Sequence, residues 1–125
     1  AYCAYSGGRL PTRDEWLLSA YTELRDEPDG EYQTGKVYRY PIGDTPVGMN
    51  NNRSHHLSVK TTQKGVNGLF DMGGNVWEWL ADRREAEALT AGGSWWYGPE
   101  KATVNGLQWK PTDFYAVYIG FRCVY

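Results

Sequence analysis

Only one segment of this 125-residue chain carries the signals of an α-helix, which limits the folds available to it. Thr12, followed three residues later by Glu15, has the pattern of a capping box, in which each side chain binds the backbone N–H of the other residue. Apolar side chains then recur at helical spacing, at Trp16, Leu17, Ala20, Tyr21 and Leu24. This spacing predicts a helix with one face toward the core, and residues 26–30, with a proline and a glycine, are expected to end it.

The rest of the chain has to be built from strands and loops. Residues 37–40, 89–96 and 115–125 have the composition of strands, and residues 41–56 contain the glycine, proline and asparagine of a long irregular loop. Fifteen glycines accompany six tryptophans, ten tyrosines and three phenylalanines. Rigid aromatic contact surfaces combined with backbone freedom favour a loop-rich recognition domain over a helical bundle.

Length and charge exclude several classes of protein. A chain of this size predicts one compact soluble domain, residues 1–125. The net charge of -2 and pI near 5.7 argue against nucleic acid or an anionic membrane as the partner. A mean hydropathy of -0.64, with no apolar run of transmembrane length, argues against a membrane span. Because the chain opens on Ala1 rather than methionine, we expect a processed or trimmed product.

Motifs for independent catalytic chemistry are not found. His55 and His56 are adjacent, and no further ligand follows at the spacing of a zinc protease, so both are expected to be solvent-exposed loop residues. Ser94 lacks the strand-to-helix pattern of a nucleophile elbow. Two cysteines without CxxC spacing argue against zinc. The mixed charges of residues 83–87 are typical of a solvated turn.

Four ordered blocks along the chain carry a more specific signal. They are AYCA leading into GRLPTRDEW (residues 8–16), GLFDMGGNVWEW (68–79), GGSW (92–95) and IGFRC (119–123). Together they resemble the formylglycine-generating enzyme (sulfatase-modifying factor) family. The resemblance implies an α+β, loop-rich C-type lectin fold with small antiparallel sheets and one clear helix near the N-terminus. It also implies that the leading strands of the family domain are absent or were left out here.

The resemblance implies two structural sites. Cys3 and Cys123 match positions that are disulfide-linked in some members, and a bond there would suit a cell or virion surface; the alternative is two buried free thiols. A structural calcium ion is implied at the positions Asp71, Gly74, Val76 and Glu78. The alternative is that Glu78 pairs with an arginine such as Arg122. No redox cofactor is expected.

Catalysis in this family depends on two copper-binding cysteines, whose positions map to Tyr97 and Ala102. A phenol and a methyl group cannot replace thiolates as copper(I) ligands, so we expect this protein not to be an enzyme. The open alternatives are a metal-dependent oxidase or sulfoxide synthase homologue with a different site, and a structural or oligomer-forming module.

The C-terminal part instead resembles the variable region of diversity-generating-retroelement proteins, the non-enzymatic branch of this fold. In those proteins, reverse-transcriptase errors randomise selected codons on an exposed face, and residues 92–122 correspond to that region. The resemblance implies these ligand-binding positions: Trp96, Tyr97, Lys101, Val104, Asn105, Leu107, Trp109, Asp113, Tyr115, Val117 and Tyr118. The expected partner is a macromolecule, with protein as the favoured class, bound by rigid aromatic anchors among adaptable polar groups.

Overall fold

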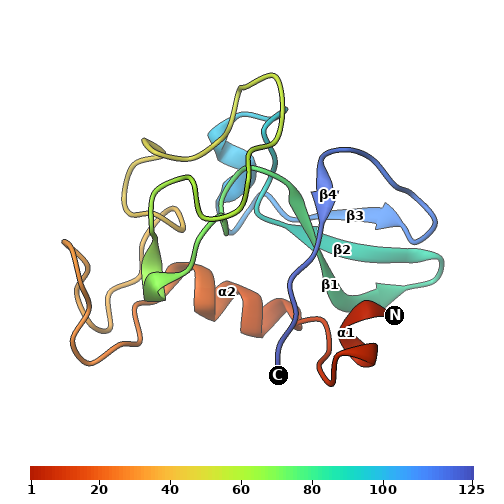
Figure 1. The fold of residues 1–125 in the computed structure, drawn as a ribbon, viewed down its shortest axis with the longest axis horizontal. Coiled ribbons are helices and arrows are strands. Elements are labelled where there is room, and N and C mark those ends of the chain that lie inside the picture. Colours follow the sequence, from red (N-terminus) through yellow and green to blue (C-terminus); the bar gives the residue numbers. More distant parts are fainter.

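The computed structural model describes all residues from Ala1 to Tyr125, and most of the chain runs in irregular segments around one small sheet (Figure 1). Two α-helices and two 3-10 helices accompany four strands. In chain order they are α1 (Tyr2–Tyr5), α2 (Arg13–Tyr21), η1 (Val66–Gly68), β1 (Trp77–Arg84), β2 (Glu87–Ala91), η2 (Pro99–Ala102), β3 (Gln108–Pro111) and β4 (Ile119–Gly120). The α+β, loop-rich lectin-type fold expected from the sequence is confirmed.

The four strands form a single sheet in the order β3-β2-β1-β4. The pairs β1/β2 and β2/β3 are antiparallel, whereas β4 runs parallel to β1. The sheet is therefore mixed, with one parallel pair beside the expected antiparallel ones. Glu85, at a positive φ of 48°, turns the chain between β1 and β2 in the predicted solvated turn.

The register of the sheet separates its side chains onto two faces, because residues opposite each other in neighbouring strands share a face. Leu89 lies opposite Trp109, and Leu80, Leu89 and Ala91 pack with α2, so this side is called the helix face. Trp79 lies opposite Thr90, and Ala88 lies between Arg83 and Lys110 in the register. This second side, with Trp77, is called the outer face.

Helix α2 begins as the sequence predicts and ends earlier. Thr12 accepts a hydrogen bond from the backbone N of Glu15 at 3.3 Å, and a Glu15 carboxylate oxygen accepts one from the N of Thr12 at 2.9 Å. Trp16, Ala20 and Tyr21 are buried, but the helix stops at Tyr21. The Asn67 side-chain amide binds the carbonyls of Ser19 and Thr22, which satisfies the last turn. Leu24 lies beyond the helix and is exposed, so its place in the core stripe was wrong.

One strand prediction was wrong and two were too long. Residues 37–40 form no strand, because Val37 and Tyr40 make only isolated bridges, to Thr22 and Gly43. Strand β2 ends at Ala91 because Gly92 takes a φ of 93°, and a side chain there would collide with the carbonyl oxygen of Met72. Within residues 115–125 only Ile119–Gly120 pairs as a strand. Residues 41–56 are irregular, as expected.

A disulfide joins Cys3 to Cys123, across a sequence separation of 120 residues, and confirms the pairing implied by the resemblance. It ties α1 to the C-terminal segment, and the bridge between Arg9 and Val124 continues the contact. Both chain ends lie on the lower side of the view in Figure 1. None of the helices combines the length and the apolar character that crossing a membrane requires.

Candidate functional site

An aromatic cluster centred on Tyr118 lies where β1 meets β4. The ring of Tyr118 lies 6.1 Å from that of Trp96, 6.0 Å from that of Tyr97 and 6.4 Å from that of Trp95. Phe114 adds a ring at 6.5 Å, and Trp77 packs edge-on against Tyr97 at 5.4 Å. These separations are typical of favourable tilted and edge-to-face aromatic pairs. We call these six residues the aromatic cluster.

Backbone contacts fix the cluster on the sheet. The N of Trp77 donates to the carbonyl of Tyr118 at 2.7 Å, which places the loop before β4 beside the start of β1. The N of Trp95 donates to the carbonyl of Asn75 at 2.8 Å. Asn75, buried and at a φ of 63°, also accepts hydrogen bonds from Asn50 Nδ2 and from the N of Leu57. Asn75 thus holds the loop of residues 50–57 against the cluster, a role that the sequence analysis missed.

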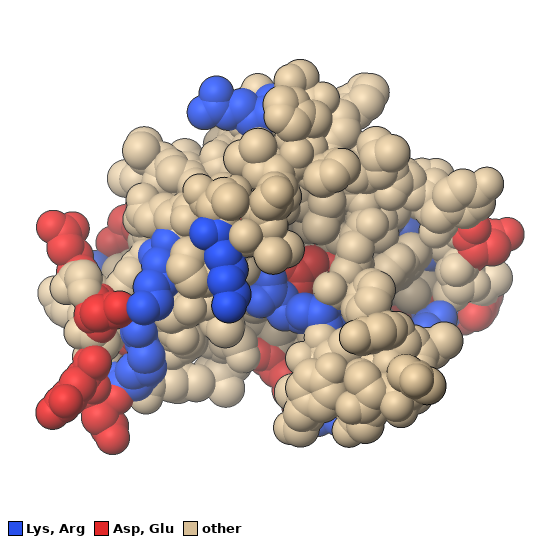
Figure 2. Space-filling view, in the orientation of Figure 1, with Lys and Arg blue, Asp and Glu red and all other residues tan.

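The cluster emerges at the surface on one side. The indole of Trp96 is 64% exposed and Phe114 40%, whereas Trp77 and Trp95 are buried. Tyr115 and Val117, in the loop beside Tyr118, are 90% and 70% exposed. Much of the face drawn in Figure 2 carries neither acidic nor basic side chains, and charges of both signs lie toward its left and right ends and near its middle. Neither sign of charge dominates this face.

The structure brings together only some of the eleven predicted ligand-binding positions. None is fully buried: six are exposed and five half-buried. Trp96, Tyr97 and Tyr118 belong to the cluster, and Asp113, Tyr115 and Val117 lie in the loop that contains Phe114. Val104 and Asn105 instead line a separate hollow of about 430 Å³ with Val37 and Asp44, and Lys101 lies at the end of η2.

Leu107 and Trp109 depart most from the predicted arrangement. Both pack against the core between α2 and the sheet. The guanidinium of Arg84 lies over the Trp109 ring, 4.5 Å from its centroid. Because Trp109 is on the helix face, it points away from the outer face, from which Trp77 contributes to the cluster. These two residues therefore share no surface with Trp96.

Lys110 lies next to the cluster and was not among the predicted positions. Its side chain is buried, with Nζ 3.7 Å from the centroid of the Trp77 ring and 2.8 Å from Thr90 Oγ1. No carboxylate lies beside it. Burial, with a smaller contribution from the charge of Lys101, lowers the pKa of Lys110 to about 8. A lysine in the middle of a strand gives no sequence signal of this environment.

Tyr97 and Ala102, the two positions that the resemblance maps to copper-binding cysteines, differ in exposure. The half-buried ring of Tyr97 is packed between Trp77 and Tyr118, and burial raises the pKa of its hydroxyl. Ala102 is buried beside Tyr40 and Ile42, and its carbonyl accepts a hydrogen bond from Tyr21 at 2.6 Å. Neither side chain supplies a thiolate.

In this structure the two carboxylates implied for calcium are engaged by other groups of the protein. Both carboxylate oxygens of Glu78 are bound by the guanidinium of Arg122, and Trp16 Nε1 donates to one of them. The carboxylate of Asp71 accepts from the hydroxyl of Thr62 and the N of Lys60. Calcium needs six to eight converging oxygens. The alternative pairing of Glu78 with Arg122 is the one present.

Comparisons with known proteins agree with this architecture. Inactive C-alpha-formylglycine-generating enzyme 2 from Bos taurus is 30% identical to this chain over an alignment of 141 residues. The alignment covers 98% of this chain and 46% of that protein. The chain thus spans less than half the length of this curated relative.

Two solved structures share the fold. A structure described as the crystal structure of CarF is 28% identical, with a TM-score of 0.70, over 93% of this chain and 46% of that one. Treponema denticola variable protein 1 is 21% identical, with a TM-score of 0.60, over 91% of this chain and 46% of that one. The model of the sulfatase-modifying factor enzyme 1-like domain matches residues 1–125. The chain therefore belongs to this FGE-sulfatase domain family.

Proposed function

We propose that this protein is a non-catalytic ligand-binding member of the family, the variable protein of a diversity-generating retroelement. Its C-terminal region presents an aromatic-rich surface to a macromolecular target, and protein is the favoured class. The observation that carries the proposal is the position of Trp96, Tyr115 and Val117. Each is at least 64% exposed, beside an aromatic cluster whose inner rings are buried in the scaffold.

This surface combines a rigid base with exposed positions that tolerate substitution, and the combination supports a binding role. Trp95 and Trp77 anchor the cluster through backbone hydrogen bonds that do not depend on the exposed side chains. Exposed aromatics that are held by a rigid base lose little conformational entropy on binding, which makes them effective anchors for a protein partner. Side chains on the exposed positions can change without disturbing the core.

The absence of catalysis is supported by the residues at the two copper-ligand positions. Tyr97 is engaged in ring packing, and Ala102 is inside a second small core with Tyr40, Ile42 and Met49. The name of the related Bos taurus protein describes it as inactive. The Treponema denticola neighbour is named a variable protein, and the proposal extends that description to this chain.

The proposal is tested first at the genetic locus. We expect a reverse-transcriptase gene nearby and a near-identical repeat of the segment that encodes residues 92–122, differing only at adenines. A locus with neither feature contradicts the assignment to a retroelement, even if the protein binds a ligand.

The second test separates surface from core. A library randomised at Trp96, Tyr115 and Val117 should remain folded in most clones, with melting temperatures within a few degrees of the parent, since surface changes usually shift stability little. A matched library at the buried residues Trp77, Leu80 and Trp95 should mostly unfold. Selection of the surface library on immobilised protein targets should yield binders that lose binding when position 96, 115 or 117 is changed to alanine. Unfolding of the surface library would assign these residues to the core.

A further inference from the structure

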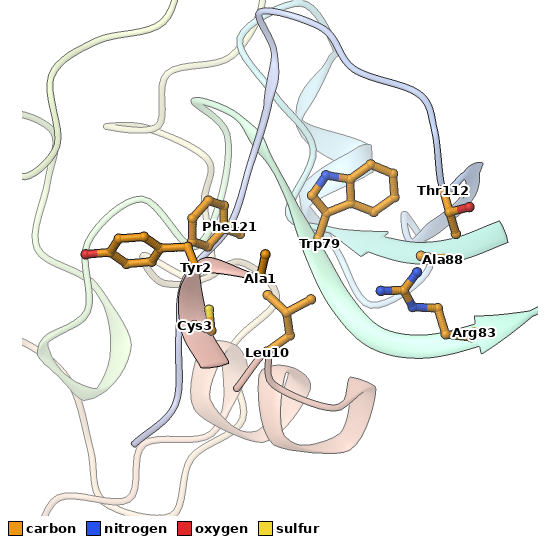
Figure 3. Close-up of a pocket in the computed structure, with 9 residues that line it drawn as sticks. All are labelled: Ala1, Tyr2, Cys3, Leu10, Trp79, Arg83, Ala88, Thr112 and Phe121. Carbon is orange, nitrogen blue, oxygen red and sulfur yellow. The ribbon is translucent and has the colours of Figure 1, made fainter. Parts of the chain in front are cut away.

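A pocket of about 250 Å³ lies over the outer face of the sheet, lined by β1 and β2, α1 and the C-terminal segment. Its walls are apolar, formed by Tyr2, Leu10, Trp79 and Phe121, and its polar side chains are Arg83 and Thr112. Figure 3 shows the Arg83 guanidinium pointing toward the space between Trp79 and Leu10. None of the residues in the aromatic cluster or among the eleven predicted positions lines this pocket.

The guanidinium of Arg83 has no anionic partner. The neighbouring Arg84, on the helix face, pairs with Glu87 at 3.0 Å, and Arg9 pairs with Glu15 at 2.7 Å, but no salt bridge or hydrogen bond engages the Arg83 side chain. Across the sheet, Ala88 lies between Arg83 and Lys110 on the outer face. This row therefore holds two cations and no carboxylate, and the small, buried Ala88 leaves room above it.

The chemistry of the pocket suits an anion with an apolar body. Arginine binds a carboxylate through two parallel N–H donors, and the hydroxyl of Thr112 offers one more donor at the same rim. The ring of Trp79 and the exposed pair Tyr2 and Phe121, 5.9 Å apart, can cover a ring or a branched chain. The volume limits the occupant to a small molecule.

We propose that this pocket is a second binding site, which takes a small monocarboxylic acid with an aromatic or branched apolar body. Arg83 holds the carboxylate, and Trp79, Leu10 and Phe121 enclose the apolar body. This site goes beyond the proposed binding of a macromolecule and does not depend on it, because it uses a different set of residues.

The test is an NMR titration of the isotopically labelled chain with 3-phenylpropionate, with 3-phenylpropanol as the uncharged control. We expect the acid to shift the indole N–H signal of Trp79, assigned from a Trp79→Phe variant, in a saturable manner. The alcohol should bind at least tenfold more weakly, since it lacks the charge that pairs with Arg83. Equal binding of the two compounds overturns the proposal.

Two matched variants test whether Arg83 is the cation that binds the carboxylate. Arg83→Gln should weaken binding of 3-phenylpropionate by about tenfold or more and leave binding of the alcohol unchanged. Arg84→Gln, one residue along on the opposite face, should bind the acid like the parent. Both positions are exposed, so both variants should keep the parent's melting temperature. Unchanged binding by the Arg83 variant overturns the proposal.

A third variant separates this site from the proposed function. Trp96→Ala combined with Tyr115→Ala removes the exposed aromatic surface and should leave the 3-phenylpropionate titration unchanged. If the acid instead shifts the Trp96 indole signal and the double variant loses binding, the acid occupies the aromatic surface and the second site does not exist.

Discussion

Lys110 places an amine inside the protein with no carboxylate beside it. The Trp77 ring and the Thr90 hydroxyl compensate only part of the lost hydration, and burial therefore lowers the pKa of Lys110 to about 8. The folded state thus releases a proton that the unfolded chain keeps up to its ordinary pKa of 10.5. By linkage, this group makes stability rise as the pH increases from about 8 toward 10.5.

Replacing Lys110 with methionine should remove the energetic cost of burying the ammonium group. We expect the free energy of unfolding at pH 7 to increase by roughly 1 to 3 kcal/mol, because a similar apolar chain then packs on Trp77 without a charge to desolvate. The rise in stability between pH 8 and 9.5 should be smaller than in the parent. Urea unfolding across this pH range measures both, with the exposed Lys60→Met as the control. A less stable Lys110→Met protein would show that the ammonium is a net stabilising group.

Glu78, one of the residues implied for calcium, forms an ion pair with Arg122. The Glu78 side chain is 5% exposed and that of Arg122 31%. Glu78→Gln should therefore lower the free energy of unfolding by about 3 kcal/mol, because it leaves a guanidinium largely buried without its counter-charge. The matched change Glu87→Gln, in an exposed pair with Arg84, should cost about 0.5 kcal/mol or less. Urea unfolding of the two variants makes the comparison.

The same ion pair predicts the response to metal. Calcium or a chelator should leave the melting temperature of the parent protein unchanged, since both oxygens of Glu78 are already bound by Arg122. An increase in melting temperature that saturates with calcium would show that the ion can displace the guanidinium and restore the site implied by the family resemblance.

At the level of elements, the stability of helix α2 depends more on its N-terminal cap than on its length. It has nine residues, too few to be stable alone, and depends on its capping box and on the burial of Trp16. Thr12→Ala should lower the free energy of unfolding by about 1 kcal/mol, because the backbone N of Glu15 loses its acceptor. Thr12→Ser should restore most of it. If alanine and serine unfold at the same urea concentration, the cap contributes nothing.

The pH dependence of this cap follows from Glu15. Its pKa is lowered to about 2, first by the hydrogen bond from Arg9 and then by the N–H of Thr12. The contribution of the carboxylate should therefore be fully present above pH 4.5 and lost as the pH falls through about 2. Comparison of the parent with Glu15→Gln should show a difference in unfolding midpoint that shrinks only below pH 4.5.

The elements that could be predicted from the sequence are those with local signals. The capping box marks the start of α2 within one segment, whereas β4 is a strand only because its two residues pair with β1, more than forty positions away. Residues 37–40 have strand composition but no continuous partner. Composition reports the tendency of a segment to be extended, and the tertiary structure decides whether it pairs.

At the scale of the whole molecule, the sheet register decides which aromatics can act together. The pattern of large apolar residues after residue 95 indicates a binding region, but not that Trp109 faces α2 while Trp96 and Tyr118 face solvent and one another. A shift of one position in β3 would exchange Trp109 and Lys110 between the faces. Asn75, Lys110 and Arg83 escaped sequence reasoning for the same reason, since their roles depend on partners far along the chain.

The Cys3–Cys123 disulfide constrains the molecule as a whole, because it closes nearly the entire chain into a loop. Restricting the unfolded chain over a separation of 120 residues is expected to contribute on the order of 4 to 5 kcal/mol. Reduction should therefore lower the urea midpoint substantially, while thiol labelling confirms two free cysteines. A Cys3→Ala, Cys123→Ala protein should resemble the reduced parent and should not respond to reductant.

Because the bond holds α1 and the C-terminal segment over the pocket, reduction should also weaken binding of 3-phenylpropionate more than it disturbs the surface around Trp96. An unchanged midpoint after complete reduction would mean that the contacts between Arg9 and Val124 hold the two ends together without the bond.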